Sequence, residues 1–159
     1  MDQALVVEAE QSRWGEPACT SPDHIWTKIS RKDTAGAWSM FESRVPPGLA
    51  VPLHQHHSQE EWFWVLEGTF WFEVGGHKHR LTAGMSLLAP RRVPHRWTKT
   101  NASSGRVLIL AQPADRLEDF FDRFARMSPE HQHDMALTSP LFADCGMELL
   151  GPPMEPPEE

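Results

Sequence analysis

The 159-residue sequence has no tyrosine, only two cysteines and no long uninterrupted apolar run. Two cysteines, Cys19 and Cys145, cannot form the dense disulfide framework of a small secreted scaffold, so a reducing compartment is expected. The longest hydrophobic region is broken by Glu67 and Glu73, which excludes a transmembrane helix of about 20 residues. The N-terminal stretch lacks the basic region of a signal peptide. We therefore expect a soluble, cytoplasmic protein.

Positive charge is also scarce. The chain has 15 Lys and Arg against 22 Asp and Glu, which gives a formal net charge of −7. Its basic residues form no cluster beyond pairs such as Arg31-Lys32 and Arg91-Arg92. Nucleic acids and anionic membranes are bound through positive patches, so neither is an expected partner. The absence of tyrosine also removes one common proton donor from any active site.

The length suits a single domain that buries about two thirds of its unfolded surface. Between residues 26 and 112, short apolar stretches alternate with turn signals about every eight to twelve residues, which is typical of an all-β sandwich or small barrel. The barrel itself is expected over residues 37–112. Residues 1–36 are expected to form an N-terminal extension that could add an edge strand. Residues 113–150 have a helical pattern. Residues 151–159 form a Pro-rich acidic tail, and we expect its last few residues to be disordered.

Hydrophobic periodicity places the individual elements. Leu117, Phe120, Phe121 and Phe124 recur at helical spacing, so this stripe predicts a helix packed on the sheet. A second short helix is expected over residues 129–137. A Gly-Gly pair at 75–76 predicts a hairpin turn. The expected strands cover residues 37–44, 61–66, 70–74, 77–81, 86–89 and 106–111.

The segment 62–66 is apolar at every position, although an antiparallel strand with one face in water should alternate. Something must therefore cover its second face. A partner subunit in a homodimer is one interpretation. The other is that the N-terminal lead-in or the C-terminal helices of the same chain provide the cover.

Three histidines and one glutamate have the spacing of metal ligands. His54 and His56 lie at i and i+2, which on a strand places both on one face. Glu61 follows five residues later at the start of the next strand, and His95 comes from a different strand pair. Three imidazole nitrogens and one carboxylate oxygen suit a divalent first-row transition metal. The alternative is that these histidines are ordinary loop or core residues satisfied by hydrogen bonds.

The residues around these ligands resemble the two sequence motifs of the cupin family. The six-residue gap that follows Glu61 in the first motif selects this residue over the adjacent Glu60, which a one-residue slip in register would bring inward instead. The motif positions are Gly48, His54, His56, Glu61 and Gly68 for the first motif, and Gly84, Pro90 and His95 for the second.

The resemblance covers about residues 37–112 and implies an all-β cupin double-stranded β-helix, also called a jelly-roll barrel, followed by C-terminal α-helices. The segments 117–121 and 146–153 are similar to the tails of single-domain bacterial cupins described as quercetin-dioxygenase-like. The resemblance also implies that His54, His56, Glu61 and His95 hold one divalent transition metal per chain. Iron, nickel, manganese, cobalt, copper and zinc all remain open.

The function that this resemblance favours is a metal-dependent dioxygenase that cleaves an enolisable small molecule, flavonol- or diketone-like. Three His and one Glu leave about two octahedral positions for substrate and dioxygen, and Glu61 would act as the catalytic general base. Two alternatives stay open. One is an oxygen-independent metal enzyme that isomerises, cyclises or dehydrates a polyketide- or sugar-like substrate. The other is a non-catalytic module that binds a metal or a small ligand.

Strand alternation predicts which side chains wall the substrate pocket. If Glu61 faces inward, Phe63 does so too, and the tryptophans beside it face outward. On the following strand, Phe70 and Phe72 are expected to face inward. His57, beside the first motif, is a further candidate for contact with substrate or metal. For the aromatic residues, a plain hydrophobic core is the simpler interpretation.

Overall fold

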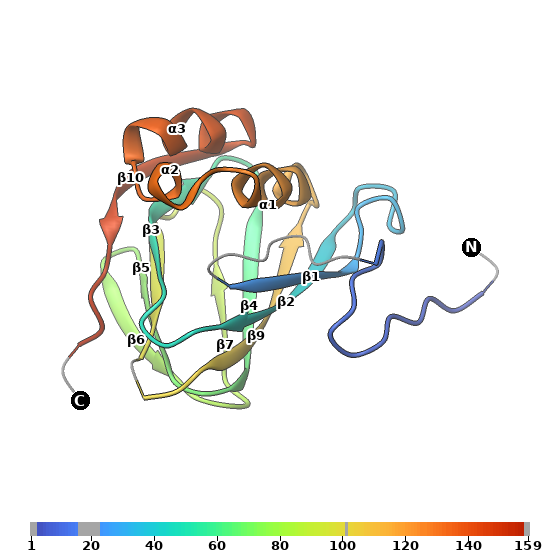
Figure 1. Cartoon of the computed structure of the whole chain (residues 1–159), viewed down its shortest axis with the longest axis horizontal. Helices are drawn as coiled ribbons and strands as arrows, with labels where there is room; N and C mark the ends of the chain where they lie inside the picture. Colours follow the sequence, from blue (N-terminus) through green and yellow to red (C-terminus); the bar gives the residue numbers. More distant parts are fainter. Residues whose placement is uncertain (1–2, 16–22, 101, 158–159) are drawn as a thin grey trace.

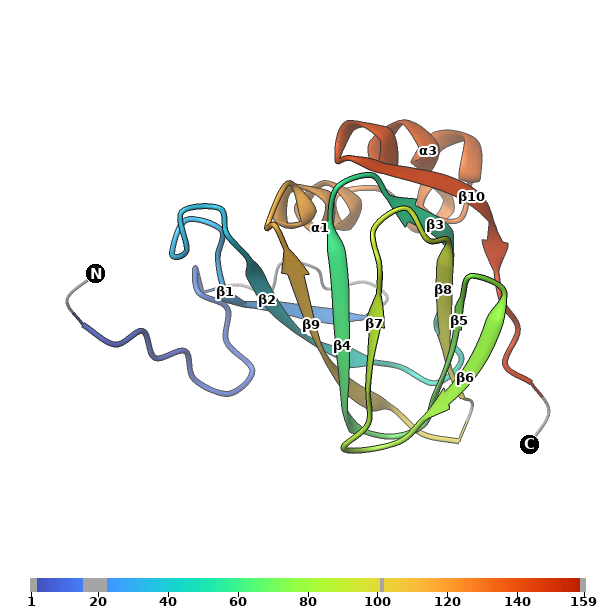
Figure 2. The same cartoon turned by 180° about the vertical axis from the view of Figure 1, so that it is seen from behind.

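Figure 1 shows two facing sheets that form a barrel, with the helices gathered at one end, and Figure 2 shows the same arrangement from behind. The computed structural model describes residues 3–15, 23–100 and 102–157. Within these ranges, no helix combines the length and the apolar character needed to cross a membrane. In chain order the elements are β1 (His24–Ile29), β2 (Ser39–Val45), β3 (Ala50–His56), β4 (Glu60–Glu67), β5 (Phe70–Val74), β6 (His77–Leu81), β7 (Ser86–Ala89), β8 (His95–Lys99), β9 (Gly105–Gln112), α1 (Leu117–Ala125), α2 (Pro129–Gln132), α3 (Met135–Asp144) and β10 (Met147–Pro153).

The strands divide between two antiparallel sheets of five. One sheet has the order β1-β2-β9-β4-β7 and the other has the order β10-β3-β8-β5-β6. The chain crosses repeatedly from one sheet to the other, for example from β3 to β4 and from β8 to β9. This confirms the predicted all-β jelly-roll barrel with C-terminal helices. β1, which lies in the N-terminal extension, is the edge strand of the first sheet and pairs with β2.

The hairpin predicted at the Gly-Gly pair is present. β5 and β6 pair from Phe70 opposite Leu81 to Val74 opposite His77. Gly75 and Gly76 between them have positive φ values of 57° and 81°, which a two-residue hairpin turn requires and which glycine adopts without strain. The other predicted strands agree with the structure to within two residues at each end.

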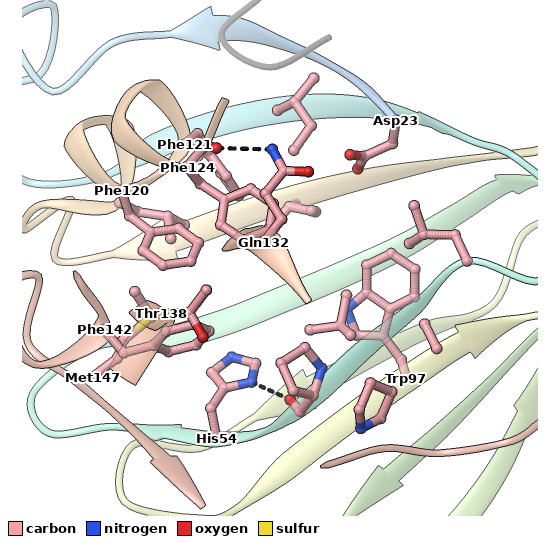
Figure 3. Close-up of a pocket in the computed structure, with 18 of the residues that line it drawn as sticks. Asp23, His54, Trp97, Phe120, Phe121, Phe124, Gln132, Thr138, Phe142 and Met147 are labelled. Carbon is pink, nitrogen blue, oxygen red and sulfur yellow. Dashed lines mark hydrogen bonds between the residues drawn. The ribbon is translucent and has the colours of Figure 1, made fainter. Parts of the chain in front are cut away.

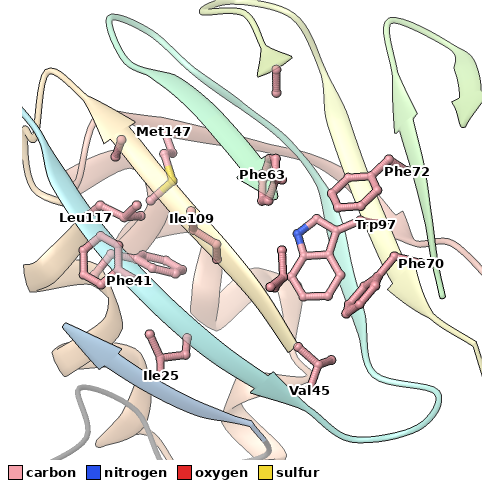
Figure 4. Close-up of a cluster of buried hydrophobic side chains, with 14 of the residues drawn as sticks. Ile25, Phe41, Val45, Phe63, Phe70, Phe72, Trp97, Ile109, Leu117 and Met147 are labelled. Carbon is pink, nitrogen blue, oxygen red and sulfur yellow. The ribbon is translucent and has the colours of Figure 1, made fainter. Parts of the chain in front are cut away.

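Aromatic side chains of both sheets fill the interior of the barrel (Figure 4). Phe70 and Phe72 on β5 are at most 1% exposed. Their ring centroids lie 5.8 and 6.0 Å from that of Trp97 on β8. Phe63 on β4 of the other sheet completes this contact, 5.0 Å from Phe72. The two sheets are thus joined through a packed aromatic core.

The C-terminal segment differs from the prediction in two places. The single helix expected at 129–137 is divided into α2 and α3, because the Asp134 side chain caps α3 by accepting a hydrogen bond from the backbone N–H of Ala136. Where helix was expected to residue 150 and an irregular tail beyond, Met147–Pro153 forms β10, which pairs with β3. This pairing satisfies backbone groups of β3 that an open edge would leave exposed. Residues 158–159, at the end of the predicted disordered tail, lie outside the described residues.

The outer face of β4 is apolar and open. Trp62 and Trp64 point away from the core, as alternation predicts. Trp64, Leu66 and Leu88 remain 42%, 39% and 51% exposed. The alternative to a partner subunit was that the N-terminal lead-in or the C-terminal helices cover this face. The described part of the N-terminal segment and the C-terminal helices leave it uncovered.

A homodimer through this face stays a prediction. At the margin of this face, Glu60 forms an ion pair with Arg91. Trp64→Glu is expected to convert a dimer into a monomer, because its carboxylate would be buried in the interface without a partner. Light scattering after size-exclusion chromatography measures the mass. Lys78→Glu, on the exposed part of β6, is the control, and a monomeric wild-type chain would contradict the prediction.

Candidate metal centre

The four predicted ligands come together inside the barrel. His54 and His56 lie on β3, Glu61 lies on β4, and His95 begins β8. All four residues are at most 5% exposed. Their ligand atoms lie within 4.8 Å of one another. The structure therefore assembles the predicted set at one buried point.

Strand register explains this assembly. His54 pairs directly with His95 across β3 and β8, so these two rings are neighbours, with centroids 4.4 Å apart. Alternation along β4 turns Glu61 inward. Glu60 turns outward and pairs with Arg91, so the register that would have made Glu60 the ligand does not occur.

Backbone carbonyl groups fix the orientation of two of the imidazole rings. Nδ1 of His54 donates a hydrogen bond to the carbonyl oxygen of Pro52 at 2.8 Å. Nδ1 of His95 donates to the carbonyl oxygen of Val93 at 3.1 Å. Because these protons lie on Nδ1, each neutral ring presents the lone pair of Nε2 to the centre. This is the usual way in which metal-binding histidines are oriented.

Gln59 holds the third ring and is a residue that sequence reasoning missed. Its Oε1 accepts a hydrogen bond from Nδ1 of His56 at 2.7 Å. Its Nε2 donates to the carbonyl oxygens of Pro113 and Ala114, both at 2.9 Å. These two donations determine which amide atom faces the histidine. The one signal in the sequence is the position of Gln59 between the ligands His56 and Glu61.

The histidine Nε2 atoms converge on the carboxylate. Nε2 of His56 and Nε2 of His95 each lie 3.0 Å from Oε2 of Glu61. The contact with His95 has hydrogen-bond geometry, whereas Nε2 of His56 is buried without a hydrogen-bond partner among the described residues. A cation at this point would satisfy that nitrogen. Three nitrogens and one carboxylate oxygen also match the ligand preferences of divalent first-row metals, so the residues fit the metal that the sequence implies.

Burial and mutual attraction set the charges of these groups. Burial, together with repulsion from His95 and His56, lowers the pKa of His54 to about 3. Burial would raise the pKa of Glu61, but electrostatic attraction to His56 and His95 holds that pKa well below its ordinary value. Burial also opposes a charge on His56, yet Glu61 raises the pKa of this ring. Neutral His54 and ionised Glu61 are metal-binding forms, and a bound cation would displace a proton from His56.

A cavity of about 310 Å³ extends from the ligands on β3 and β4 toward the helices (Figure 3). This volume accommodates a small organic molecule. Phe63 and Trp97 line it from the barrel, and Phe120, Phe121 and Phe124 line it from α1. The helical stripe that the sequence predicts to pack on the sheet therefore also forms a wall of the cavity.

Four residues were predicted to contact the substrate: His57, Phe63, Phe70 and Phe72. Of these four, Phe63 is the one found among the residues that line the cavity. Phe70 and Phe72 face inward as predicted, but they pack behind Trp97 in the core and are not among the residues that line this cavity. His57 lies in the bend that follows β3 and is exposed. It is not among the residues that line this cavity.

Two facing sheets around a buried cluster of three histidines and one glutamate define a jelly-roll domain whose interior could hold one metal ion. Residues 41–111 match the model of the Cupin domain family. The protein SchB of Streptomyces halstedii is 34% identical over 82 residues, which cover 50% of this chain and 59% of SchB. The matched stretch spans less than two thirds of the length of the curated relatives.

Solved structures share the fold. An RmlC-like cupin from Shewanella frigidimarina superposes with a TM-score of 0.56 at 20% identity, covering 74% of this chain and 96% of that one. A predicted oxalate decarboxylase from Thermotoga maritima gives a TM-score of 0.55 at 20% identity, covering 57% and 80%. At these identities the likeness shows the fold alone.

The role of Gln59 can be tested by removing its acceptor oxygen. Gln59→Leu is expected to weaken zinc binding about 10–100-fold, because His56 loses the group that orients its ring. Competition with a chromophoric chelator measures the affinity. Gln55→Leu is the matched control, since Gln55 lies on the outer face of β3 and bonds Glu148. Equal zinc affinity in the two variants would count against the positioning role.

Proposed function

We propose that the chain is a metal-dependent dioxygenase that cleaves a small enolisable molecule, flavonol- or diketone-like. The observation that carries this proposal is the orientation of the ligands. Each of the three imidazoles donates through Nδ1 to a carbonyl-type oxygen, so all three Nε2 atoms face Glu61 at one buried point. The cavity beside this point supports a small-molecule substrate.

Each residue of the centre would have a separate role in the reaction. A divalent metal held here would supply a Lewis acid with about two open positions, which suits a substrate hydroxyl beside a carbonyl together with dioxygen. Glu61, whose low pKa keeps it ionised at neutral pH, would accept the hydroxyl proton at a carboxylate oxygen. His54 stays neutral and binds through Nε2. Phe63 and Phe142 border the cavity and exclude water from the proton transfer.

Dioxygen uptake tests the proposal. The protein is loaded separately with iron(II), nickel(II), manganese(II), cobalt(II), copper(II) or zinc(II) and mixed with flavonols and other enolisable diketones. His56→Ala, treated with the same metals, is the blank. We expect uptake that requires both a bound metal and His56.

Two results would contradict a dioxygenase. One is absence of uptake with every metal although the substrates bind. The other is conversion of a substrate without oxygen consumption, which would favour an oxygen-independent isomerase, cyclase or lyase that uses the same centre as a Lewis acid.

A further inference from the structure

The cavity has a second polar end that the proposed metal chemistry does not use. Asp23 borders the cavity. Figure 3 shows its carboxyl group directed toward Gln132, on the opposite side of the cavity from His54. A ligand that reaches from the metal centre across the cavity would therefore meet an acidic side chain at its far end.

Local geometry explains why Asp23 faces the cavity. It directly precedes β1, and alternation places it on the same side as Ile25, which also borders the cavity. Ser43 on the neighbouring strand β2 is fully buried and donates a hydrogen bond from Oγ to Oδ2 of Asp23 at 3.1 Å. The carboxyl group is thus held in a defined position at the cavity wall.

The surroundings of Asp23 are unfavourable for a carboxylate. The residue is 8% exposed, and burial raises the pKa of its carboxyl group although the hydrogen bond from Ser43 acts in the opposite direction. Burying such a group costs stability unless a partner compensates it. A buried titratable group beside a cavity is therefore a candidate for a functional role.

Aromatic rings form the walls between the two polar ends. Phe120 on α1 and Phe142 on α3 meet edge to face, with centroids 4.7 Å apart, and both border the cavity. Phe63 and Trp97 border it from the barrel. Such walls favour a flat aromatic ligand, because ring faces and edges pack closely on one another.

We propose that Asp23 is a specificity-determining residue, which accepts a hydrogen bond from a hydroxyl group at the end of an aromatic substrate remote from the metal. The substrate class is then a flat phenol with an oxygen pair for the metal at one end and a hydroxyl group at the other. This inference rests on the proposed metal centre but not on the use of dioxygen.

Two flavones that differ by a single hydroxyl group test this assignment. 3-Hydroxyflavone carries the metal-binding oxygen pair, and 3,4′-dihydroxyflavone adds a hydroxyl group at the opposite end. Both are titrated into zinc-loaded protein, with tryptophan fluorescence as the readout because Trp97 borders the cavity. We expect wild-type protein to bind the dihydroxy compound at least about tenfold more tightly.

Two variants assign this preference to the carboxyl group. Asp23→Leu has a similar size without an acceptor, so the two flavones should bind it within about twofold of each other. Asp23→Asn keeps an acceptor oxygen and is expected to retain part of the preference. If Asp23→Leu does not fold, the proposal is still tested by the ratio of the two flavone affinities in the wild-type chain and in Asp23→Asn.

Equal affinity of the two flavones for the wild-type chain would overturn the proposal, as would a preference that survives in Asp23→Leu. Binding of neither flavone to zinc-loaded protein would overturn the substrate class. Failure of the dioxygenase proposal would look different: binding would depend on Asp23 as expected, and no oxygen would be consumed.

Discussion

His95→Ala and Glu61→Ala are each expected to purify with little metal, whereas the wild-type chain retains about one ion. Each variant removes a ligand atom from a set whose members all lie within 4.8 Å of one another. The loss of affinity should exceed the roughly 10–100-fold effect of an outer-shell change such as Gln59→Leu. Elemental analysis of the dialysed protein measures the metal content, and circular dichroism shows whether the barrel remains folded.

An exposed histidine provides the matched control for this comparison. His79 lies on β6 with its side chain in solvent, so His79→Ala makes the same substitution away from the centre and should leave the metal content unchanged. Wild-type occupancy in folded His95→Ala or Glu61→Ala would show that the ligands have been assigned incorrectly.

Phe72→Ala is expected to destabilise the protein by about 3–5 kcal/mol without changing its metal content. Phe72 is 1% exposed and packs against Phe63 and Trp97, so the substitution leaves a void in the core. The free energy of unfolding of a single domain is about 5–15 kcal/mol, so the expected loss is a large fraction of it. Denaturant titration measures the free energy of unfolding.

The same variant separates the core from the cavity. Because Trp97 rather than Phe72 borders the cavity, the folded Phe72→Ala protein should bind 3-hydroxyflavone as tightly as the wild-type chain does. A loss below about 1 kcal/mol, or a weakened affinity for the flavone in the folded protein, would mean that Phe72 belongs to the cavity wall after all.

Features with a local cause could be predicted from the sequence. The turn at Gly75 and Gly76 requires positive φ values, so this pair indicates a hairpin before any contact is known. The two-residue period of β4 separates the inward Glu61 from the outward Glu60. The motif spacing around His54 likewise predicts the metal ligands from the sequence, and the structure brings the four side chains together.

Features that depend on distant partners could not be predicted in this way. β10 is a strand because the edge of β3 needs a partner, and nothing within residues 147–153 indicates this. Gln59 is important because it bonds His56 and the backbone at Ala114, far along the chain. Asp23 lies in a stretch without periodicity, and its place at the cavity follows from the pairing of β1 with β2.

X-ray absorption spectroscopy of the zinc-loaded wild-type chain tests the central claim most directly, because it reports the ligands of the bound ion. The account predicts one zinc per chain, coordinated by three imidazole nitrogens and one carboxylate oxygen at about 2.0–2.2 Å. The three nitrogens are those of His54, His56 and His95, and the oxygen is that of Glu61. A spectrum with fewer than three imidazoles, or a chain that binds no zinc, would contradict it.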